Sequence, residues 1–333
     1  MSLFRCAFGF LRRKQTFVCV LCVLSFSIGC FFITQRQDRS CCEQVRLLEK
    51  ALEIANADLK RIVAERNRLK IENDSHVTRA NTKSTIYAIT PTYARLTQKA
   101  DLTRLAQTLR HVPNFHWILV EDSPSKTSLV TRFLSTSGLT YTHLAIPTAP
   151  QRKLRADEPR WKKARGVEQR NLAIEYLVQN KADKGGVVYF ADDDNTYDVR
   201  IFEEMRKTRR VSVWPVGLTG GLRFEGPVCL NGAVTGWHTA WHPERPFPLD
   251  MAGFAVNLAE LVRNKRARID PNAARGYLES SLLEPILRKE DAEPLAKDCT
   301  EILVWHTRTE APKMKDEERL AKLGKPSNPA IET

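Results

Sequence analysis

The stretch Gly185-Gly186-Val187-Val188-Tyr189-Phe190-Ala191-Asp192-Asp193-Asp194-Asn195-Thr196 decides how the rest of the sequence is interpreted. Its apolar run from Val187 to Ala191 is rich in β-branched and aromatic residues, which predicts a buried strand. Three carboxylates follow directly, and they repel one another at the end of such a strand unless a cation lies among them. Oxygen ligands favour Mg²⁺ or Mn²⁺, ions that commonly bridge a protein to substrate phosphates. The alternative is an acidic turn or helix start, which Asp also favours.

Strands alternate with helices on both sides of this stretch. The predicted strands are 85–90, 116–120, 141–146, 187–191, 211–216 and 302–305, and the predicted helices are 102–109, 129–134, 167–178, 199–207 and one that begins near 279. This alternation predicts an α/β fold with a mostly parallel, doubly wound sheet. Ligands bind at the carboxyl ends of strands in such sheets, so we expect Tyr93, Asp122 and Asp192–Asp194 to meet there.

An uncharged apolar segment lies close to the N-terminus. Residues 15–35 contain no charged side chain and are long enough to span a membrane, and the basic residues Arg12-Arg13-Lys14 precede them. We therefore expect a cytoplasmic tail over 1–14 and an uncleaved signal-anchor helix over 15–35, with the remaining chain outside the cytosol. The alternative is a cleaved signal peptide that ends at Ser27-Ile28-Gly29.

The next segment, 36–84, is interpreted as a stem. Its apolar residues follow heptad spacing over 45–69, which predicts a coiled coil, with Arg66 as an exception at a core position. We expect a dimeric stalk linked by a disulfide through Cys41 or Cys42, the alternative being a single solvated helix. A polar linker follows and carries the glycosylation sequon Asn73-Asp74-Ser75.

Charge and cysteine usage restrict the classes of partner. The net charge of +13 over 333 residues suits an anionic substrate, although solubility alone would also explain it. No basic run is interleaved with aromatic residues, so we expect no nucleic-acid binding. None of the eight cysteines forms a pair with zinc-ligand spacing, and the sequence leaves the state of Cys229 and Cys299 open.

A helix near the C-terminal end carries a carboxylate on its apolar face. Leu282, Leu283, Ile286 and Leu287 stand three, four, seven and eight positions after Glu279, so this glutamate begins the apolar stripe. Partial desolvation raises the pKa of a carboxylate toward the range of a general base. The alternative is a first-turn glutamate that complements the helix dipole.

Several long motifs resemble those of the β-1,3-glucuronosyltransferase family. The motifs are Thr90–Tyr93, Val120–Asp122, Val167–Asn171, Tyr189–Tyr197, Asp250–Phe254, Leu278–Leu283 and Val304–Glu310. The resemblance covers about residues 85–333. Within the family, Gly220–Pro227 and His238–Trp241 look most similar to the members that complete the proteoglycan linkage tetrasaccharide.

The resemblance implies a GT-A fold, with a Rossmann-like donor half over 85–197 and an acceptor half over 198–333. It also implies UDP-glucuronate as donor, Mn²⁺ as cofactor, inversion at the anomeric carbon, and a Golgi membrane enzyme of type II topology. The implied acceptor is a terminal galactose of the Gal-Gal-Xyl linkage region on a proteoglycan core protein. The alternatives are capping of N-acetyllactosamine on glycoproteins, another nucleotide-sugar donor, or a non-catalytic Golgi scaffold or lectin.

The resemblance assigns roles residue by residue. Glu279 matches the catalytic base and Asp194 the metal ligand. The implied donor-side residues are Tyr93 and Asp122 for the uridine, Asp192 and Asp193 for the nucleotide and sugar, and Arg165, Arg170, Arg275, His306 and Arg308 for the phosphates and carboxylate. The implied acceptor-side residues are Glu225, Trp241, Arg245 and Asp250.

Family resemblance also implies a homodimer whose C-terminal tail reaches the acceptor site of its neighbour. The tail carries Asp316 at a position where the resemblance leads us to expect Gln. The sequon expected just before Cys299 is missing because residue 298 is Asp. This second change removes a glycan without touching the residues assigned to the chemistry.

Overall fold

The computed structural model describes residues 49–66, 84–154, 158, 163–329 and 331. The chain divides into two units, Met1–Val77 and Thr78–Thr333. In the first unit residues 49–66 form a helix with exposed apolar side chains, among them Leu52 and Ile62. The predicted membrane helix, Cys41, Cys42 and Asn73 lie outside the described residues. Among the residues that are described, no helix is long and apolar enough to cross a membrane.

The second unit is built on a seven-stranded mixed sheet with the order β11-β6-β10-β4-β1-β2-β3. These strands are β1 (Ile86–Thr92), β2 (Phe115–Glu121), β3 (Tyr141–Ala145), β4 (Val187–Phe190), β6 (Val211–Val213), β10 (Phe254–Asn257) and β11 (Glu293–Pro294). β4, β1, β2 and β3 are mutually parallel, whereas β10 is antiparallel to both of its neighbours. The predicted α/β class and the mostly parallel sheet are therefore confirmed.

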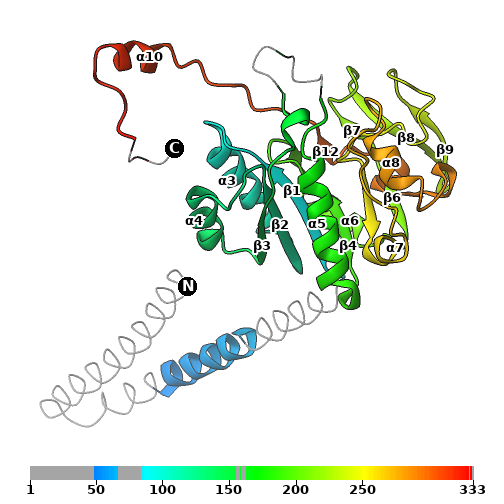
Figure 1. Ribbon diagram of the computed structural model, residues 1–333. Helices are drawn as coiled ribbons and strands as arrows, with labels where there is room; N and C mark the ends of the chain where they lie inside the picture. The colour runs from blue at the N-terminus through cyan, green and yellow to red at the C-terminus, as the bar shows by residue number, and fades with distance from the viewer. Residues whose placement is uncertain (1–48, 67–83, 155–157, 159–162, 330, 332–333) are drawn as a thin grey trace, which may run out of the picture. The chain divides into compact units, whose positions relative to one another are not determined.

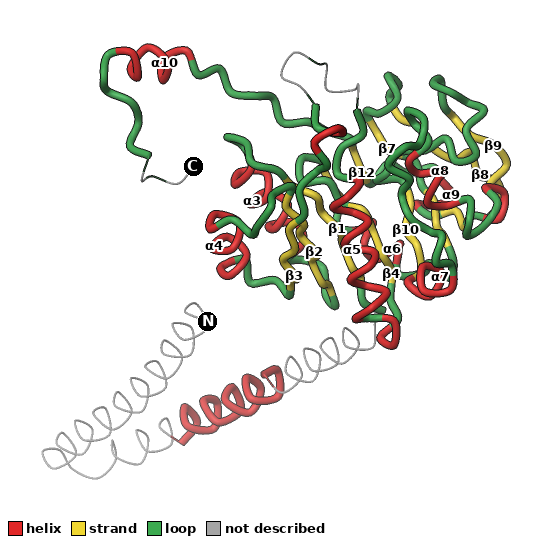
Figure 2. The backbone as a smooth tube through the Cα atoms, viewed as in Figure 1, coloured by secondary structure: helices red, strands yellow, loops and turns green. Residues whose placement is uncertain are grey.

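Helices cover both faces of this sheet (Figure 1). One face carries α3 (Gln98–Leu109), α4 (Ser128–Thr136) and α6 (Arg200–Met205), and the other carries α5 (Val167–Asn180), α7 (Leu258–Arg263) and α8 (Leu278–Leu283). Successive strand residues point to opposite faces. In β1, Ile86 and Ala88 thus join the first core, and Tyr87 and Ile89 join the second. The strands run between these two helical layers in Figure 2.

A second sheet, which the sequence pattern did not predict, has the order β5-β12-β7-β8-β9. Its strands are β5 (Thr196–Tyr197), β7 (Val216–Gly217), β8 (Phe224–Leu230), β9 (Ala233–His238) and β12 (Val304–Trp305). The predicted strand 211–216 is wrong in extent, because its ends belong to different sheets as β6 and β7. Trp214 and Pro215 separate the two pieces, and proline cannot donate to a central ladder.

Each of the two sheets contains strands from before and after residue 197, the predicted boundary between the donor and acceptor halves. β10 lies between β4 and β6, and β12 pairs with both β5 and β7. Thr78–Thr333 accordingly forms one compact unit. The shorter elements are η1 (Pro150–Arg152), η2 (Ala182–Lys184), η3 (Lys289–Asp291), α9 (Ala296–Cys299) and α10 (Lys315–Lys322).

A disulfide joins Cys229 on β8 to Cys299 on α9, across a sequence separation of 70 residues. α9 is a left-handed turn, because Ala296, Lys297, Asp298 and Cys299 all have φ between 52° and 62°. Left-handed backbone costs a non-glycine residue about 1–2 kcal/mol. The disulfide anchors this turn together with Asp298, whose carboxylate accepts the Gly232 N–H at 3.2 and 3.3 Å.

The double variant Cys229→Ser/Cys299→Ser should unfold more easily than the wild type. Loss of a native cross-link of this loop length typically lowers the free energy of unfolding by about 2–5 kcal/mol. Urea or thermal unfolding measures the loss, and a reductant should destabilise the wild type but not the double variant. Equal melting temperatures for the two proteins would contradict a stabilising cross-link.

Candidate active site

The carboxyl ends of three neighbouring parallel strands place part of the predicted donor-side residues at one edge of the large sheet. Tyr93 follows β1, Asp122 follows β2 and Asp192 follows β4, and β1 is paired with both other strands. From β1 the chain continues to β2 and β3 on one side and then returns to β4 on the other. Open α/β sheets bind ligands where the strand order reverses in this way. The expected convergence of Tyr93, Asp122 and the aspartate triad is confirmed.

The three aspartates have different partners. Asp192 Oδ1 accepts a hydrogen bond from Arg170 Nη2 at 2.5 Å. Asp193 is buried, with Arg95 Nη2 at 2.8 Å from Oδ1 and Thr92 Oγ1 donating to Oδ2 at 2.7 Å. Asp194 has no ion pair to any described residue.

Burial also shifts the acidity of two of these carboxylates. It raises the pKa of Asp193 to about 6 although Arg95 and Thr92 oppose the shift. Burial and the neighbouring Asp192 raise the pKa of Asp194 as well. Asp194 is partly buried, lies next to a second carboxylate and has no ion pair within the described part of the chain, so a bound cation would compensate its charge.

The residues predicted to hold the uridine surround the end of β1. Tyr93 is 38% exposed, and Arg95 lies 4.7 Å and Arg165 6.0 Å from its ring centre. Asp122 is fixed by Thr148, whose backbone N–H donates to Oδ1 at 2.6 Å and whose hydroxyl donates to Oδ2 at 2.7 Å. An exposed aromatic face beside a fixed carboxylate suits a flat, hydrogen-bonding ring.

A cavity of about 530 Å³ adjoins the segment after β12. It is lined by Leu218, Thr219, Gly220, Gly221, His306, Thr307 and Arg308. His306 Nδ1 lies 2.8 Å from Asp250 Oδ2, and this contact raises the pKa of His306. Burial alone would raise the pKa of Asp250, but His306 lowers it overall. Asp250 thus favours the protonated form of His306, and an imidazolium beside Arg308 at the cavity would favour an anionic ligand.

Three of the four predicted acceptor-side residues, Glu225, Trp241 and Arg245, lie close together and include a buried ion pair, whereas Asp250 contacts His306. Arg245 Nη2 lies 2.6 Å from Glu225 Oε1, and both side chains are buried. Gly220 closes over this carboxylate, because a Cβ there would lie 2.0 Å from Glu225 Oε2. The guanidinium groups of Arg275 and Arg245 lie 4.9 and 5.4 Å from the Trp241 ring centre. Arg275, predicted on the donor side, is thus placed against an acceptor-side residue.

Glu279 occupies the first turn of α8, where Leu282 and Leu283 are fully buried. Burial raises its pKa to about 7, and Asp250 adds to the shift while Arg245 and Arg170 oppose it. No ion pair in the described part of the chain holds its carboxylate. Gly276 precedes the helix with φ of +84°, and a Cβ there would lie 2.2 Å from the Trp241 ring. The backbone before Glu279 therefore packs directly on that tryptophan.

The described residues contain no group of three or more His, Cys, Asp or Glu side chains arranged to hold a metal ion. Mg²⁺ and Mn²⁺ are commonly held by one or two carboxylates together with substrate phosphates. Asp194 fits that limited protein contribution, because Arg170 and Arg95 already neutralise its two neighbours. The residues present thus fit a cation that is shared with a diphosphate.

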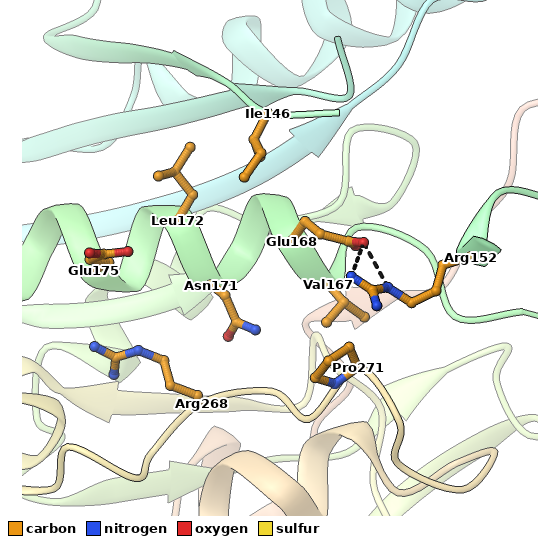
Figure 3. Close-up of a pocket in the computed structure, with 9 residues that line it drawn as sticks. All are labelled: Ile146, Arg152, Val167, Glu168, Asn171, Leu172, Glu175, Arg268 and Pro271. Carbon is orange, nitrogen blue, oxygen red and sulfur yellow. Dashed lines mark hydrogen bonds and ion pairs between the residues drawn. The ribbon is translucent and has the colours of Figure 1, made fainter. Parts of the chain in front are cut away.

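A separate cavity of about 300 Å³ beside α5 contains none of the predicted site residues. Figure 3 shows Glu168 and Arg152 paired at one end of the cavity, and Glu175 and Arg268 lining the other end. The Arg152 Nη2 to Glu168 Oε1 distance is 2.7 Å. The Asn171 side-chain amide donates to the Ile269 carbonyl at 2.7 Å and accepts the Ile269 N–H at 2.9 Å. We therefore place the candidate site at the strand ends and not in this cavity.

Much of this sequence is shared with known proteins. The family model described as glycosyltransferase family 43 matches residues 105–310. The galactosylgalactosylxylosylprotein 3-beta-glucuronosyltransferase 3 of Mus musculus is 58% identical over 259 residues, which cover 74% of this chain and 77% of that protein.

The chain belongs to glycosyltransferase family 43.

A second relative, the human galactosylgalactosylxylosylprotein 3-beta-glucuronosyltransferase 1, is 52% identical to this family 43 chain over 244 residues, covering 72% and 73% of the two chains. Among solved structures, Staphylococcus aureus TarS 1-349 matches with a TM-score of 0.45 and 14% identity over 67% of this chain and 60% of that one. That likeness is too remote to indicate a shared substrate. The sequence-based recognition of a glycosyltransferase of this family is confirmed by the two close relatives and the family model.

Several residues of the candidate site were not predicted from the sequence. Arg95 and Thr92 hold Asp193, and Thr307 Oγ1 donates to the backbone carbonyl of Asp194 at 2.6 Å. Each lies within three residues of a residue that was predicted. Threonine side chains are short and arginine side chains are commonly solvated, so no pattern of residue spacing indicated that these residues belong to the site.

Proposed function

We propose that this chain transfers glucuronic acid from UDP-glucuronate to the 3-hydroxyl of a terminal β-galactose, with inversion, on the Gal-Gal-Xyl proteoglycan linkage region. The relatives named for that acceptor are 52–58% identical. The structural observation that carries the proposal is Glu279, a carboxylate without an ion pair to any described residue, whose pKa burial raises to about 7. It is a base poised for neutral pH between the predicted donor and acceptor residues.

Transfer with inversion requires one displacement at the anomeric carbon. Glu279 takes the proton from the galactose 3-hydroxyl as that oxygen attacks the face of the sugar opposite to UDP. Glu225, Arg245 and Trp241 orient the acceptor, since an aromatic face packs on the apolar face of a sugar. Burial of the Glu225–Arg245 pair keeps these groups fixed before the acceptor arrives.

The diphosphate leaves from the opposite side, near the aspartate triad. Asp194 would hold Mn²⁺, which when bound supplies positive charge to the departing diphosphate. Arg308 and His306 line the cavity beside β12 and Arg165 lies over Tyr93, so these side chains add further positive charge on the donor side. Tyr93 and Asp122 hold the uridine and so fix the position of the leaving group.

Arg170 and His306 should distinguish UDP-glucuronate from UDP-glucose. Each already pairs with one carboxylate of the protein, at Asp192 and Asp250. We expect each also to bind the carboxylate of the donor sugar. Replacing either with Ala should reduce kcat/KM for UDP-glucuronate about tenfold more than for UDP-glucose, because a charge-assisted hydrogen bond contributes about 1.5–3 kcal/mol. Arg288→Ala, which removes an exposed Arg–Asp pair, is the matched control. Equal losses with both donors would mean that the two residues bind phosphate alone.

The proposed architecture is a GT-A fold with a donor half over 85–197 and an acceptor half over 198–333. The switch point between β1 and β4 supports the donor assignment, and the cluster of Glu225, Trp241 and Arg245 supports the acceptor assignment. Both halves form within one compact unit.

A panel of UDP-sugars and galactose-terminated acceptors tests the proposed function. The unit Thr78–Thr333 should transfer glucuronic acid from UDP-glucuronate to Gal-Gal-Xyl, and Glu279→Gln should do so about 10²–10⁴-fold more slowly. Preferential use of N-acetyllactosamine would favour the glycoprotein-capping alternative. Binding of galactosides without transfer from any donor would favour a lectin or scaffold.

We further propose a homodimeric type II membrane protein of the Golgi, anchored by residues 15–35 and joined through the stem. The exposed apolar side chains on helix 49–66 support a coiled coil, because a partner helix would cover them. The full-length protein should migrate as a dimer on non-reducing gels, and the Cys41→Ser/Cys42→Ser variant as a monomer. A monomer band in the wild type would exclude the disulfide-linked stalk.

A further inference from the structure

A chain of buried ionic contacts connects α3 with the aspartate triad. Arg95 Nη2 lies 2.8 Å from Asp193 Oδ1 and also 2.8 Å from Asp101 Oδ2. The three side chains are 15%, 9% and 1% exposed. One guanidinium therefore bridges two carboxylates that are almost completely removed from water.

The other end of this chain is the segment that follows β12. Thr309 Oγ1 donates to Asp101 Oδ1 at 2.5 Å, and Arg104 Nη2 lies 3.1 Å from the same oxygen. Two residues earlier, Thr307 Oγ1 donates to the backbone carbonyl of Asp194 at 2.6 Å. The contacts thus run from Asp193 through Arg95 and Asp101 to Thr309, and return to the triad through Thr307.

This arrangement fixes the direction of the Asp193 carboxylate on both sides. Arg95 occupies Oδ1, and Thr92 occupies Oδ2 with a 2.7 Å hydrogen bond. Gln98 in turn donates to Thr92 Oγ1 at 3.2 Å. Arg95 also lies 4.7 Å from the centre of the Tyr93 ring, so the same side chain contacts the residue expected to hold the uridine.

We propose that Arg95, Asp101 and Thr309 are positioning residues of the donor site, which set the aspartate triad and Tyr93 in the arrangement that UDP and its cation require. The inference rests on the proposed function for the identity of the nucleotide. Buried ion pairs contribute little net stability compared with apolar packing, so we assign these contacts the role of fixing side-chain directions. Preset directions lower the cost of assembling a ligand site.

Conservative variants test this role, because removal of Asp101 would leave Arg95 with an uncompensated buried charge. Thr309→Val removes one hydroxyl and keeps the shape of the side chain. Its affinity for UDP in Mn²⁺ should fall about tenfold, as is usual for residues that orient metal ligands, with an unchanged affinity for uridine. Thr309→Ser should restore the wild-type affinity. Arg95→Lys cannot bridge both carboxylates or cover Tyr93 in the same way, so it should weaken both UDP and uridine.

Thr103→Val is the matched control, because the Thr103 hydroxyl donates only within α3, to the Lys99 carbonyl. Isothermal titration calorimetry with UDP and with uridine, in Mn²⁺ and in EDTA, separates the nucleoside contribution from the cation-dependent one. Melting temperatures measured in parallel report any purely structural effect.

The proposal is overturned if Thr309→Val and Arg95→Lys bind UDP as tightly as the wild type. It is equally overturned if they lower only the melting temperature. A wild type that binds UDP in Mn²⁺ but transfers no glucuronic acid would refute the proposed function and leave this inference intact. A wild type that binds no UDP would refute both.

Discussion

Glu279→Gln should reduce transfer by about 10²–10⁴-fold while leaving the binding of UDP and acceptor intact. The amide keeps the size and polarity of the side chain but cannot accept the proton of the galactose hydroxyl, and the loss of a general base has this magnitude. Initial rates and separate binding titrations distinguish the two effects. In the wild type, kcat/KM should rise with pH up to about 7 and then level off, because the base must be ionised and its pKa is raised to about 7.

The same variant should be more stable than the wild type above neutral pH. The pKa of Glu279 lies above its ordinary value of 4.5, so ionisation costs the folded state more than the unfolded state. That cost is absent below about pH 4.5, grows as the pH rises through 7 and is complete above it, reaching up to about 3 kcal/mol. Melting curves of the two proteins should therefore coincide at acidic pH and separate at pH 8.

Glu284→Gln makes the same chemical change at an exposed position that ends the same helix. It should alter neither transfer nor the pH dependence of unfolding. Should Glu279→Gln retain near-normal transfer and unfold more easily, Glu279 would be a helix-start residue that interacts with the dipole, and the base would lie elsewhere.

Asp194→Asn should abolish detectable transfer, with a loss of at least about 10³-fold, because a cation at a departing diphosphate contributes several kcal/mol. UDP affinity in Mn²⁺ should fall to the value that the wild type shows in EDTA. The fold should remain intact, since burial and Asp192 already disfavour the charged form of this carboxylate.

Chelation should reproduce the effect of this substitution in the wild type and add nothing to it in the variant. Asp183→Asn is the control, because Asp183 is exposed in η2 and pairs only with Lys184 among the described residues. Full transfer by the wild type in EDTA would exclude a cation shared between Asp194 and the diphosphate.

The large sheet could be predicted because its strands carry their own signals. Val187–Phe190 and Phe115–Glu121 are short apolar runs with β-branched residues, separated by amphipathic helices. The hairpin β8–β9 has a weaker apolar pattern, since much of it is exposed. Its turn residues Asn231 and Gly232 both have positive φ, and Asn-Gly is the strongest short-range hairpin signal, so this element was accessible from the sequence.

The position of β10 within the sheet could not be predicted from the sequence in the same way. Phe254–Asn257 is a short apolar run, but nothing in it specifies that it enters the sheet antiparallel between β4 and β6. That choice depends on contacts formed with distant parts of the chain. The contacts of Arg95 with Asp193 and Asp101 could not be predicted for a similar reason. Asp193 and Arg95 are far apart in sequence, and an isolated arginine is usually solvated.

The cross-link between Cys229 and Cys299 has a consequence for how the protein is made. It encloses β9, β10, α7 and α8, so both thiols are available only after nearly the whole polypeptide has been synthesised. Until then the left-handed turn at Ala296–Cys299 lacks its covalent anchor. Disulfides persist in secretory compartments and are rare in the reducing cytosol. Material produced in an ordinary bacterial cytoplasm should therefore carry free thiols at these two positions, and secretory or periplasmic expression should yield the oxidised form.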